Sequence, residues 1–148
     1  MSTYIKFQGF VEHLAHGVHN FDTDAITVAL TNTAPDPALS TANTILSNIT
    51  EISYTYCGSR VFPGNISIVR VGYPYEYKLG PDTPSYTFTV SASGGSVGPF
   101  RYGIIYNDTP SSPLNPLIAY YDYGSSITLN DGESILFDFD PDGTFTIL

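Results

Sequence analysis

Residues 100–106, Phe-Arg-Tyr-Gly-Ile-Ile-Tyr, decide the fold class of this chain. Aromatic and aliphatic side chains recur at every second position of the stretch, at Phe100, Tyr102, Ile104 and Tyr106. A period of two is typical of a β-strand, because successive side chains of a strand point to opposite faces of the sheet. The stretch therefore predicts a strand.

Similar stretches recur along the chain, separated by turns rich in Gly, Pro and Asn. The turn Asn130-Asp131-Gly132 is a strong tight-turn signal. The glycine-rich stretch 91–98 predicts a hairpin loop or bulge, because it has strands on both sides and lacks the helix and Lys of a phosphate-binding loop. About eight short strands predict a mainly β chain, an antiparallel β-sandwich or jelly-roll-like fold. Further strands are expected around 26–30, 66–68, 73–79, 86–90, 117–123, 135–139 and 145–147, whereas 45–56 stays ambiguous.

One helical pattern precedes the strands, over residues of about 4–19. Its apolar side chains share one face, and Ser2 or Thr3 is expected at its start and Gly17 or Asn20 at its end. The apolar stripe consists of Phe7, Phe10, Val11, Leu14 and Val18. We expect a single domain over 1–148, with this helix followed by a β-sandwich over about 25–148.

The composition excludes several classes of protein. The chain has 148 residues, 14 acidic against five basic side chains, and a net charge of −9. This balance disfavours nucleic acids and anionic membranes as partners, since both require clustered Lys and Arg. Cys57 is the only cysteine, so an intrachain disulfide is impossible. No apolar stretch reaches membrane-spanning length, and the first residues lack a signal-peptide pattern, so we expect neither.

Three histidines at three-residue spacing, His13, His16 and His19, invite a metal-site interpretation. On the predicted helix they lie opposite the apolar stripe, where side chains face solvent. The His-Glu-x-x-His pattern of zinc sites is missing. We therefore predict no metal site here.

Asp138, Asp140 and Asp142 imitate the first half of a calcium-binding loop. The twelfth position of such a loop, where a bidentate Glu belongs, falls beyond Leu148. Asp138 and Asp140 also alternate with Phe137 and Phe139, as the solvent face of a strand does. We favour this strand interpretation, and calcium bound with ligands from neighbouring chains stays open as the alternative.

The chain offers no clear catalytic constellation. No serine stands in Gly-x-Ser-x-Gly, and the only histidines crowd onto the predicted helix. Arg60 lies close enough in sequence to lower the pKa of Cys57, but a lone cysteine is more often a structural thiol. We predict no enzyme, no catalytic residue and no cofactor.

Tyrosines are the most informative residues. One group recurs at every second position over 73–77, and a second crowds residues 120–123. Each group is either the core face of a sheet or an interface, where Tyr is enriched and Lys and Glu are depleted. Candidate interaction residues are Phe7, Phe10, Tyr73, Tyr75, Tyr77, Tyr120, Tyr121 and Tyr123.

Several stretches together resemble small virion structural proteins of tailed phages and prophages. They cover roughly residues 1–35 and 92–147, and residues 54–84 depart from the pattern. The matching stretches are Tyr4-Ile-Lys-Phe-Gln-x-Phe-Val-Glu12, Gly17-Val-His-Asn20, Val28-Ala-Leu-Thr-Asn-Thr-Ala-Pro35, Gly98-Pro-Phe-Arg-Tyr102, Tyr106-Asn-Asp108, Asp122-Tyr-Gly-Ser-Ser-Ile-Thr-Leu-Asn-Asp-Gly-Glu133 and Phe137-Asp-Phe-Asp140.

This resemblance implies a capsid decoration (cement) protein. Such a protein binds and stabilises the assembled lattice of the major capsid protein, usually as a homotrimer, and is carried on the capsid surface of the virion after synthesis in the host cytoplasm. The resemblance implies no catalytic residue. One alternative is a tail, baseplate or fibre-associated virion protein. The other is a carbohydrate-binding module that uses exposed Tyr73 or Tyr75 as a sugar platform.

Overall fold

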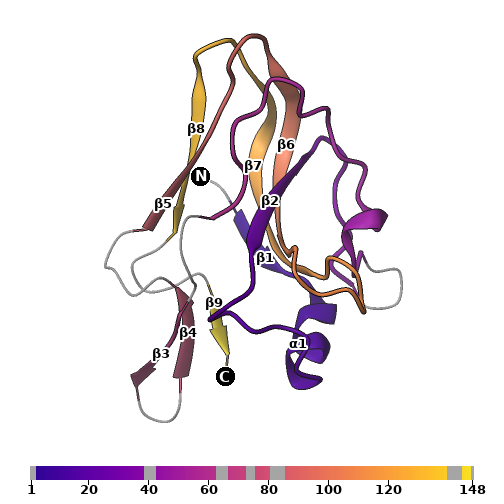
Figure 1. Cartoon of the computed structure of the whole chain (residues 1–148), viewed down its shortest axis with the longest axis vertical. Coiled ribbons are helices and arrows are strands. Elements are labelled where there is room, and N and C mark those ends of the chain that lie inside the picture. Colours follow the sequence, from indigo (N-terminus) through magenta and orange to yellow (C-terminus); the bar gives the residue numbers. More distant parts are fainter. Residues whose placement is uncertain are drawn as a thin grey trace.

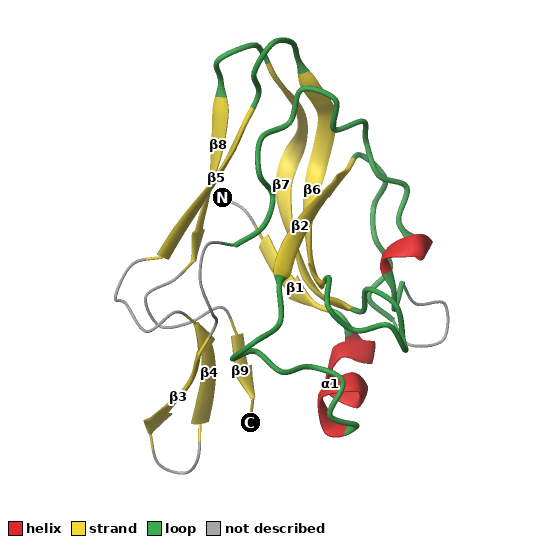
Figure 2. Cartoon of the chain, viewed as in Figure 1, coloured by secondary structure: helices red, strands yellow, loops and turns green. Residues whose placement is uncertain are grey.

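The computed structural model describes residues 3–38, 43–62, 67–72, 76–80, 86–139 and 145–147. Strands dominate these residues, alongside one α-helix and one short 3-10 helix (Figures 1 and 2). The predicted mainly β chain with antiparallel pairing and one α-helix is confirmed. The described residues hold nine strands, one more than the approximate number expected. The elements are β1 (Thr3–Lys6), α1 (Gln8–Ala15), β2 (Ile26–Thr31), η1 (Leu46–Asn48), β3 (Ser67–Gly72), β4 (Glu76–Gly80), β5 (Tyr86–Ser91), β6 (Val97–Asn107), β7 (Leu117–Leu129), β8 (Ser134–Phe139) and β9 (Phe145–Ile147).

A four-stranded antiparallel sheet forms the centre of the molecule, in the order β1-β7-β6-β2. Its second strand from the edge, β6, contains the stretch 100–106. A register shift between Phe100 and Tyr102 breaks the alternation, so Phe100 packs with Ile105 on one face while Tyr102 packs with Ile104 on the other. The prediction that Phe100 shares a face with Tyr102 is therefore wrong.

Both faces of this sheet are covered. All six residues of β2 are buried for this reason. A cluster on one face includes Phe7, Tyr102 and Tyr120. It packs against Leu46 of η1 and against Ile49, which follows η1. The opposite face carries the larger cluster.

The strand pairs β6–β7 and β5–β8 are successive parts of one long two-stranded ribbon. Pairing of β6 with β7 ends at Val97 and Leu129, and pairing of β5 with β8 resumes at Ser91 and Ser134. The ribbon bends between these points, at the top of Figure 1. The glycine-rich stretch before β6 therefore closes no hairpin, because β5 and β6 have different partners.

A tight turn forms the other half of the bend. The Glu133 N–H donates to the Asn130 carbonyl over 2.9 Å, and Gly132 takes a positive φ of 85°. The predicted turn at 130–132 is thus confirmed. It carries the chain from β7 to β8, which belong to different sheets.

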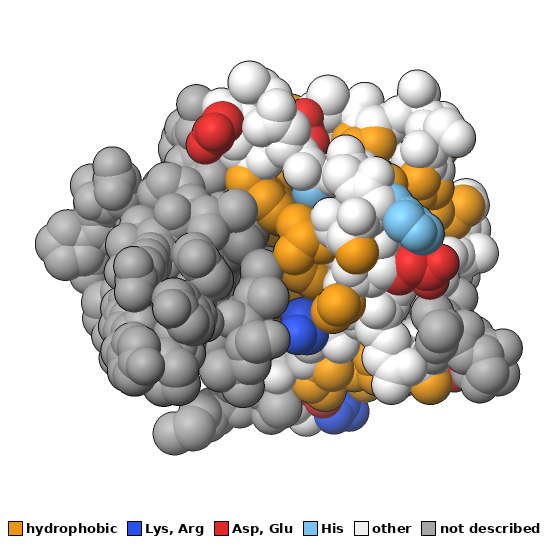
Figure 3. Space-filling model, turned by 90° about the horizontal axis from the view of Figure 1, so that it is seen from below, with side chains coloured by type: hydrophobic (Ala, Val, Ile, Leu, Met, Phe, Trp, Pro, Cys, Tyr) orange, Lys and Arg blue, Asp and Glu red, His pale blue; other side chains and the backbone are white. Residues whose placement is uncertain are grey.

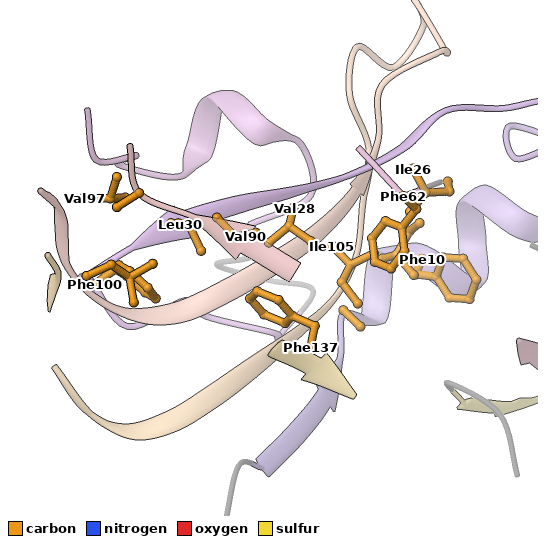
Figure 4. Packing of buried hydrophobic residues seen from close by; sticks show 14 of the residues in the cluster. Phe10, Ile26, Val28, Leu30, Phe62, Val90, Val97, Phe100, Ile105 and Phe137 are labelled. Atoms are coloured by element: carbon orange, nitrogen blue, oxygen red, sulfur yellow. The ribbon is translucent and has the colours of Figure 1, made fainter. Parts of the chain in front are cut away.

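The bend folds β5 and β8 over the larger core cluster. Phe137 of β8 and Val90 of β5 pack there with Val28 and Ile105 of the four-stranded sheet (Figure 4). The ring of Phe137 lies directly on Gly103, where a Cβ atom would come within 2.5 Å of it. A side chain at this position would therefore separate the two layers.

The N-terminal segment differs from the prediction at both ends. Residues 3–6 form β1, which pairs with residues 119–122 of β7, and α1 begins only at Gln8. Phe7 precedes the helix in an extended conformation and gives it no side-chain cap, so the predicted cap at Ser2 or Thr3 is wrong. The helix ends at Ala15, short of the expected residue 19, and is closed by Gly17, one of the two residues expected at its end. Gly17 has a φ of 70°; its N–H donates to the Leu14 carbonyl and the Val18 N–H donates to the His13 carbonyl, which is a Schellman motif.

Residues 52–62 cover the outer edge of β2 without forming a strand. The Val28 N–H donates to Arg60 O over 2.9 Å, and the Val28 carbonyl accepts from Arg60 Nη1 over 2.7 Å. The Leu30 N–H donates to Tyr54 Oη over 2.8 Å, and the Leu30 carbonyl accepts from the Ile52 N–H over 3.0 Å. The stretch 45–56, which the sequence left ambiguous, thus contains η1 and an irregular segment that satisfies this edge.

A separate three-stranded sheet, in the order β3-β4-β9, lies beside the central body in Figure 1. Tyr77 of β4 pairs with Arg70 of β3 and Ile147 of β9. Only the backbone of this sheet is described.

Candidate interaction surface

Three of the predicted interaction residues are core residues. Phe7 and Phe10 are completely buried, and Tyr120 is nearly so. Phe7 and Tyr120 contact each other, with ring centroids 5.3 Å apart. Phe7 and Tyr120 pack with Leu46 and Ile49 on one face of the sheet, and Phe10 packs in the larger cluster on the other, so the folded chain cannot offer them to a partner.

The remaining tyrosines of β7 are graded in exposure. Tyr121 is partly buried and packs against Tyr4 and Phe137, whereas Tyr123, beyond the end of β1, is 50% exposed. Among the candidates whose side chains are described, Tyr123 alone is largely exposed. Tyr73 and Tyr75 lie outside the described residues, and the side chain of Tyr77 does as well.

An ion pair stands beside Tyr123. Arg101 of β6 binds Asp122 through two parallel contacts, Nε to Oδ1 at 2.7 Å and Nη2 to Oδ2 at 2.9 Å. The bonds from Arg101, with one from the Gly124 N–H, lower the pKa of Asp122. Both carboxylate oxygens of Asp122 therefore accept hydrogen bonds within the chain.

Other apolar side chains emerge at separate places on the described surface. Figure 3 shows apolar side chains on the face seen from below, mixed with polar and a few charged groups. Besides Tyr123, the large exposed apolar residues are Val11, Tyr56, Val61, Leu114 and Leu136.

Arg60 is held at the edge of β2. Its guanidinium lies 3.6 Å from the centre of the Tyr54 ring, and the Tyr54 hydroxyl donates to Glu51 Oε2 over 2.6 Å. Burial and the bond to Glu51 raise the pKa of Tyr54. The contacts among Arg60, Tyr54 and Glu51 hold residues 51–60 against β2, so Arg60 stabilises the fold.

His19 is buried, contrary to the prediction that all three histidines face solvent. The helix ends before His19, which stacks on Phe21 at a centroid distance of 5.5 Å and contacts Phe10 at 5.1 Å. Asn107 Nδ2 lies 3.1 Å from His19 Nδ1 and donates to Asp24 Oδ2 over 2.6 Å.

This network fixes the neutral form of His19. One Nδ2 hydrogen of Asn107 goes to Asp24, so the other points to His19 Nδ1, which must accept. Burial, and second the charge of His13, lower the pKa of His19 to about 4. Within the described part of the chain, no three His, Cys, Asp or Glu side chains are grouped to hold a metal ion. Asp140 and Asp142 lie outside it, as does the side chain of Asp138.

Cys57 does not have the reactive character that its neighbour Arg60 suggested. Burial raises the pKa of its thiol and outweighs the opposing effect of the Arg60 charge.

Sequence reasoning missed one arrangement, the contact of Tyr56 with the glycine-rich loop. A Cβ atom added to Gly95 would lie 2.5 Å from the Tyr56 ring, and one added to Gly94 would lie 3.6 Å from it. Tyr56 remains 46% exposed. The pair Gly94-Gly95 is visible in the sequence as a loop signal, but nothing in the sequence connects it to Tyr56, 38 positions before Gly94.

Comparison with known proteins gives no match to a family, to a curated protein or to a solved structure. None of the helices among the described residues has the length and apolar character needed to cross a membrane.

Proposed function

We propose that this chain is a virion structural protein of a tailed phage, a capsid decoration protein that binds the assembled lattice of the major capsid protein as a homotrimer. The sequence resemblance supports this role. The observation that carries it is the scarcity of free basic side chains, beside exposed apolar ones, on the described surface. Of the three basic side chains described, Arg60 and Arg101 are engaged in ion pairs within the subunit, while Val11, Leu114 and Leu136 are about half exposed.

Such a surface suits permanent contact with protein. Interfaces are enriched in Tyr and depleted in Lys and Glu, and their strongest contributions come from aromatic residues and Arg. Tyr123 with the neighbouring Arg101–Asp122 pair supplies this chemistry on one exposed patch. We assign the capsid contact to this patch.

Stabilisation of the shell would follow from mass action. A protein that binds only the assembled lattice stabilises it by the free energy of binding at each occupied site. A symmetric trimer engages several neighbouring capsid subunits together, so each copy needs only a modest contact area. Binding of this kind requires no catalytic group.

We also propose that the chain forms a single-domain sandwich of jelly-roll type, in which β5 and β8 pack on the four-stranded sheet. Antiparallel sheets that pack through one hydrophobic face are common in virion components of this architecture. The ribbon that bends from β6–β7 into β5–β8 supports the assignment.

The test combines native mass with binding to shells. We expect a native mass of three chains in solution, and saturable co-sedimentation with decoration-free shells of the phage at hundreds of copies per particle. Tyr123→Ala should weaken binding to shells about tenfold, the effect of losing one interface aromatic. Tyr56→Ala is the matched control and should bind as the parent does. A purely monomeric protein that leaves shells bare would refute the proposal, and a few copies per particle would favour the tail or baseplate alternative.

A further inference from the structure

Tyr56 presents one face of its ring to solvent from a rigid support. The other face lies on Gly95, whose missing side chain permits the close approach. The Tyr56 carbonyl accepts the Ser93 N–H over 2.9 Å, and the Gly58 N–H donates to Ser91 O over 2.8 Å. An exposed fraction of 46% fits a ring that is covered on one side only. The ring is therefore a flat platform.

A carboxylate stands at the same loop. Asp131 Oδ1 accepts the Gly94 N–H over 2.8 Å, which ties the 130–133 turn to the glycine that contacts Tyr56. This bond uses one carboxylate oxygen, and Asp131 Oδ2 accepts no hydrogen bond within the described part of the chain. A fixed, exposed acceptor is thus bonded to the same glycine that contacts the platform.

We propose that Tyr56 and Asp131 form a binding site for a neutral pyranose sugar. The C–H groups on one face of a pyranose make an apolar surface that packs on an aromatic ring, while its hydroxyl groups, directed outward, donate to a carboxylate. Sugars that carry a negative charge are disfavoured because Asp131 and Glu133 share one turn and the chain has a net charge of −9. The site is independent of the proposed capsid contact.

Tyr123 lacks the features that this site requires. It is exposed to a similar degree, 50%, but both oxygens of its neighbour Asp122 already accept hydrogen bonds from the cation Arg101. We therefore assign sugar binding to Tyr56 and use Tyr123→Ala as the matched control.

The experiment is a titration of the full chain followed by amide NMR signals. Lactose, maltotetraose and cellotetraose are added separately, and glucuronic acid serves as the charged comparison. One ring and one carboxylate give a dissociation constant on the order of 1–10 mM. We expect saturable shifts of the Gly94, Gly95 and Gly132 signals with at least one neutral sugar, and weaker shifts with glucuronic acid.

Substitutions separate the platform from the acceptor. Tyr56→Ala should weaken binding at least about tenfold, and Tyr56→Phe should retain it because the ring face remains. Asp131→Asn keeps an oxygen for the Gly94 N–H but replaces the free acceptor with a donor, and should weaken binding about threefold to tenfold. Tyr123→Ala should bind as the parent does. The dispersion of the amide spectrum reports whether each variant is folded.

Three outcomes would overturn the proposal. The first is an absence of saturable shifts at 94–95 with every neutral sugar. The second is binding that persists in a folded Tyr56→Ala variant. The third is a shift of the same signals with protein concentration alone, which would assign the platform to contact between copies of this chain. None of these results bears on the binding to phage shells.

Discussion

Two aromatic rings lie against glycines on the same bent ribbon, with opposite consequences. Phe137 covers Gly103 inside the core and is 9% exposed, whereas Tyr56 covers Gly95 outside and is 46% exposed. A Cβ atom on either glycine would lie 2.5 Å from the facing ring. The local contact is the same, so the surroundings of the ring decide whether it stabilises the fold or remains available to a ligand.

The largest difference between the two contacts should come from deleting the rings. Phe137→Ala removes a ring enclosed by two layers and should cost about 3–4 kcal/mol of unfolding free energy. Tyr56→Ala removes a ring open to water and should cost less than about 1 kcal/mol. Urea denaturation of both variants measures the two losses, and equal losses would contradict the comparison.

Adding a methyl group to the buried glycine should have the next largest effect. In Gly103→Ala the new Cβ meets Phe137, which has no space to move because the core surrounds it, and we expect a loss of about 2–3 kcal/mol. The pair Gly103→Ala and Phe137→Leu should lose less together than the sum of the two single losses. Strict additivity would show that the methyl group is not opposed by the ring.

Lowering the pH should reduce the free energy of unfolding through the buried His19. The pKa of His19 is about 4 in the folded chain, below the value of about 6.5 in an unfolded chain, so the unfolded chain takes up a proton first as the pH falls. The free energy of unfolding should therefore decrease between pH 6.5 and 4 and level off below. From the difference between these two pKa values, the His19 contribution is at most about 3 kcal/mol.

Two glutamine variants isolate this contribution. His19→Gln should flatten the pH dependence in that interval, whereas the exposed His16→Gln should keep it. Urea denaturation at several pH values measures the slopes. Equal slopes for the parent and His19→Gln would contradict the assignment.

The smallest change in stability is expected at the exposed glycine. In Gly95→Ala the new methyl group displaces the Tyr56 ring, which can swing into solvent, so the unfolding free energy should change by less than about 1 kcal/mol. The NMR signals of the Tyr56 ring should nevertheless shift, and sugar binding should weaken. A loss as large as that of Gly103→Ala would show that Tyr56 is part of the folded core.

Much of the strand pattern could be predicted because alternation is a local property. The strands around Tyr102, Phe88 and Phe137 were found in this way. The pairing of these strands could not be predicted in this way, since the bend that separates β5 from β6 depends on contacts between distant residues. The N-terminal strand was missed because the apolar stripe through Phe7 and Phe10 extends a helical pattern backwards over residues that pair with β7 instead.

The candidate surface was harder to predict than the fold. Tyr residues serve cores and interfaces equally well, and only tertiary packing buries Tyr120 while it exposes Tyr123. His19 was misplaced because the helix was extended beyond Gly17. The covering of β2 rests on bonds from the side chains of Tyr54 and Arg60 to backbone atoms, which leave no periodic trace in the sequence.

The covered edge of β2 has a consequence for copies held at high local density. A bare strand edge recruits the edge of another molecule and starts uncontrolled polymerisation. At Val28 and Leu30 every outward backbone N–H and C=O group is already hydrogen-bonded to the chain's own residues 52–60. A neighbouring copy therefore cannot pair with β2 at these residues. The molecule can therefore be crowded edge to edge on this side without fusing into a fibre.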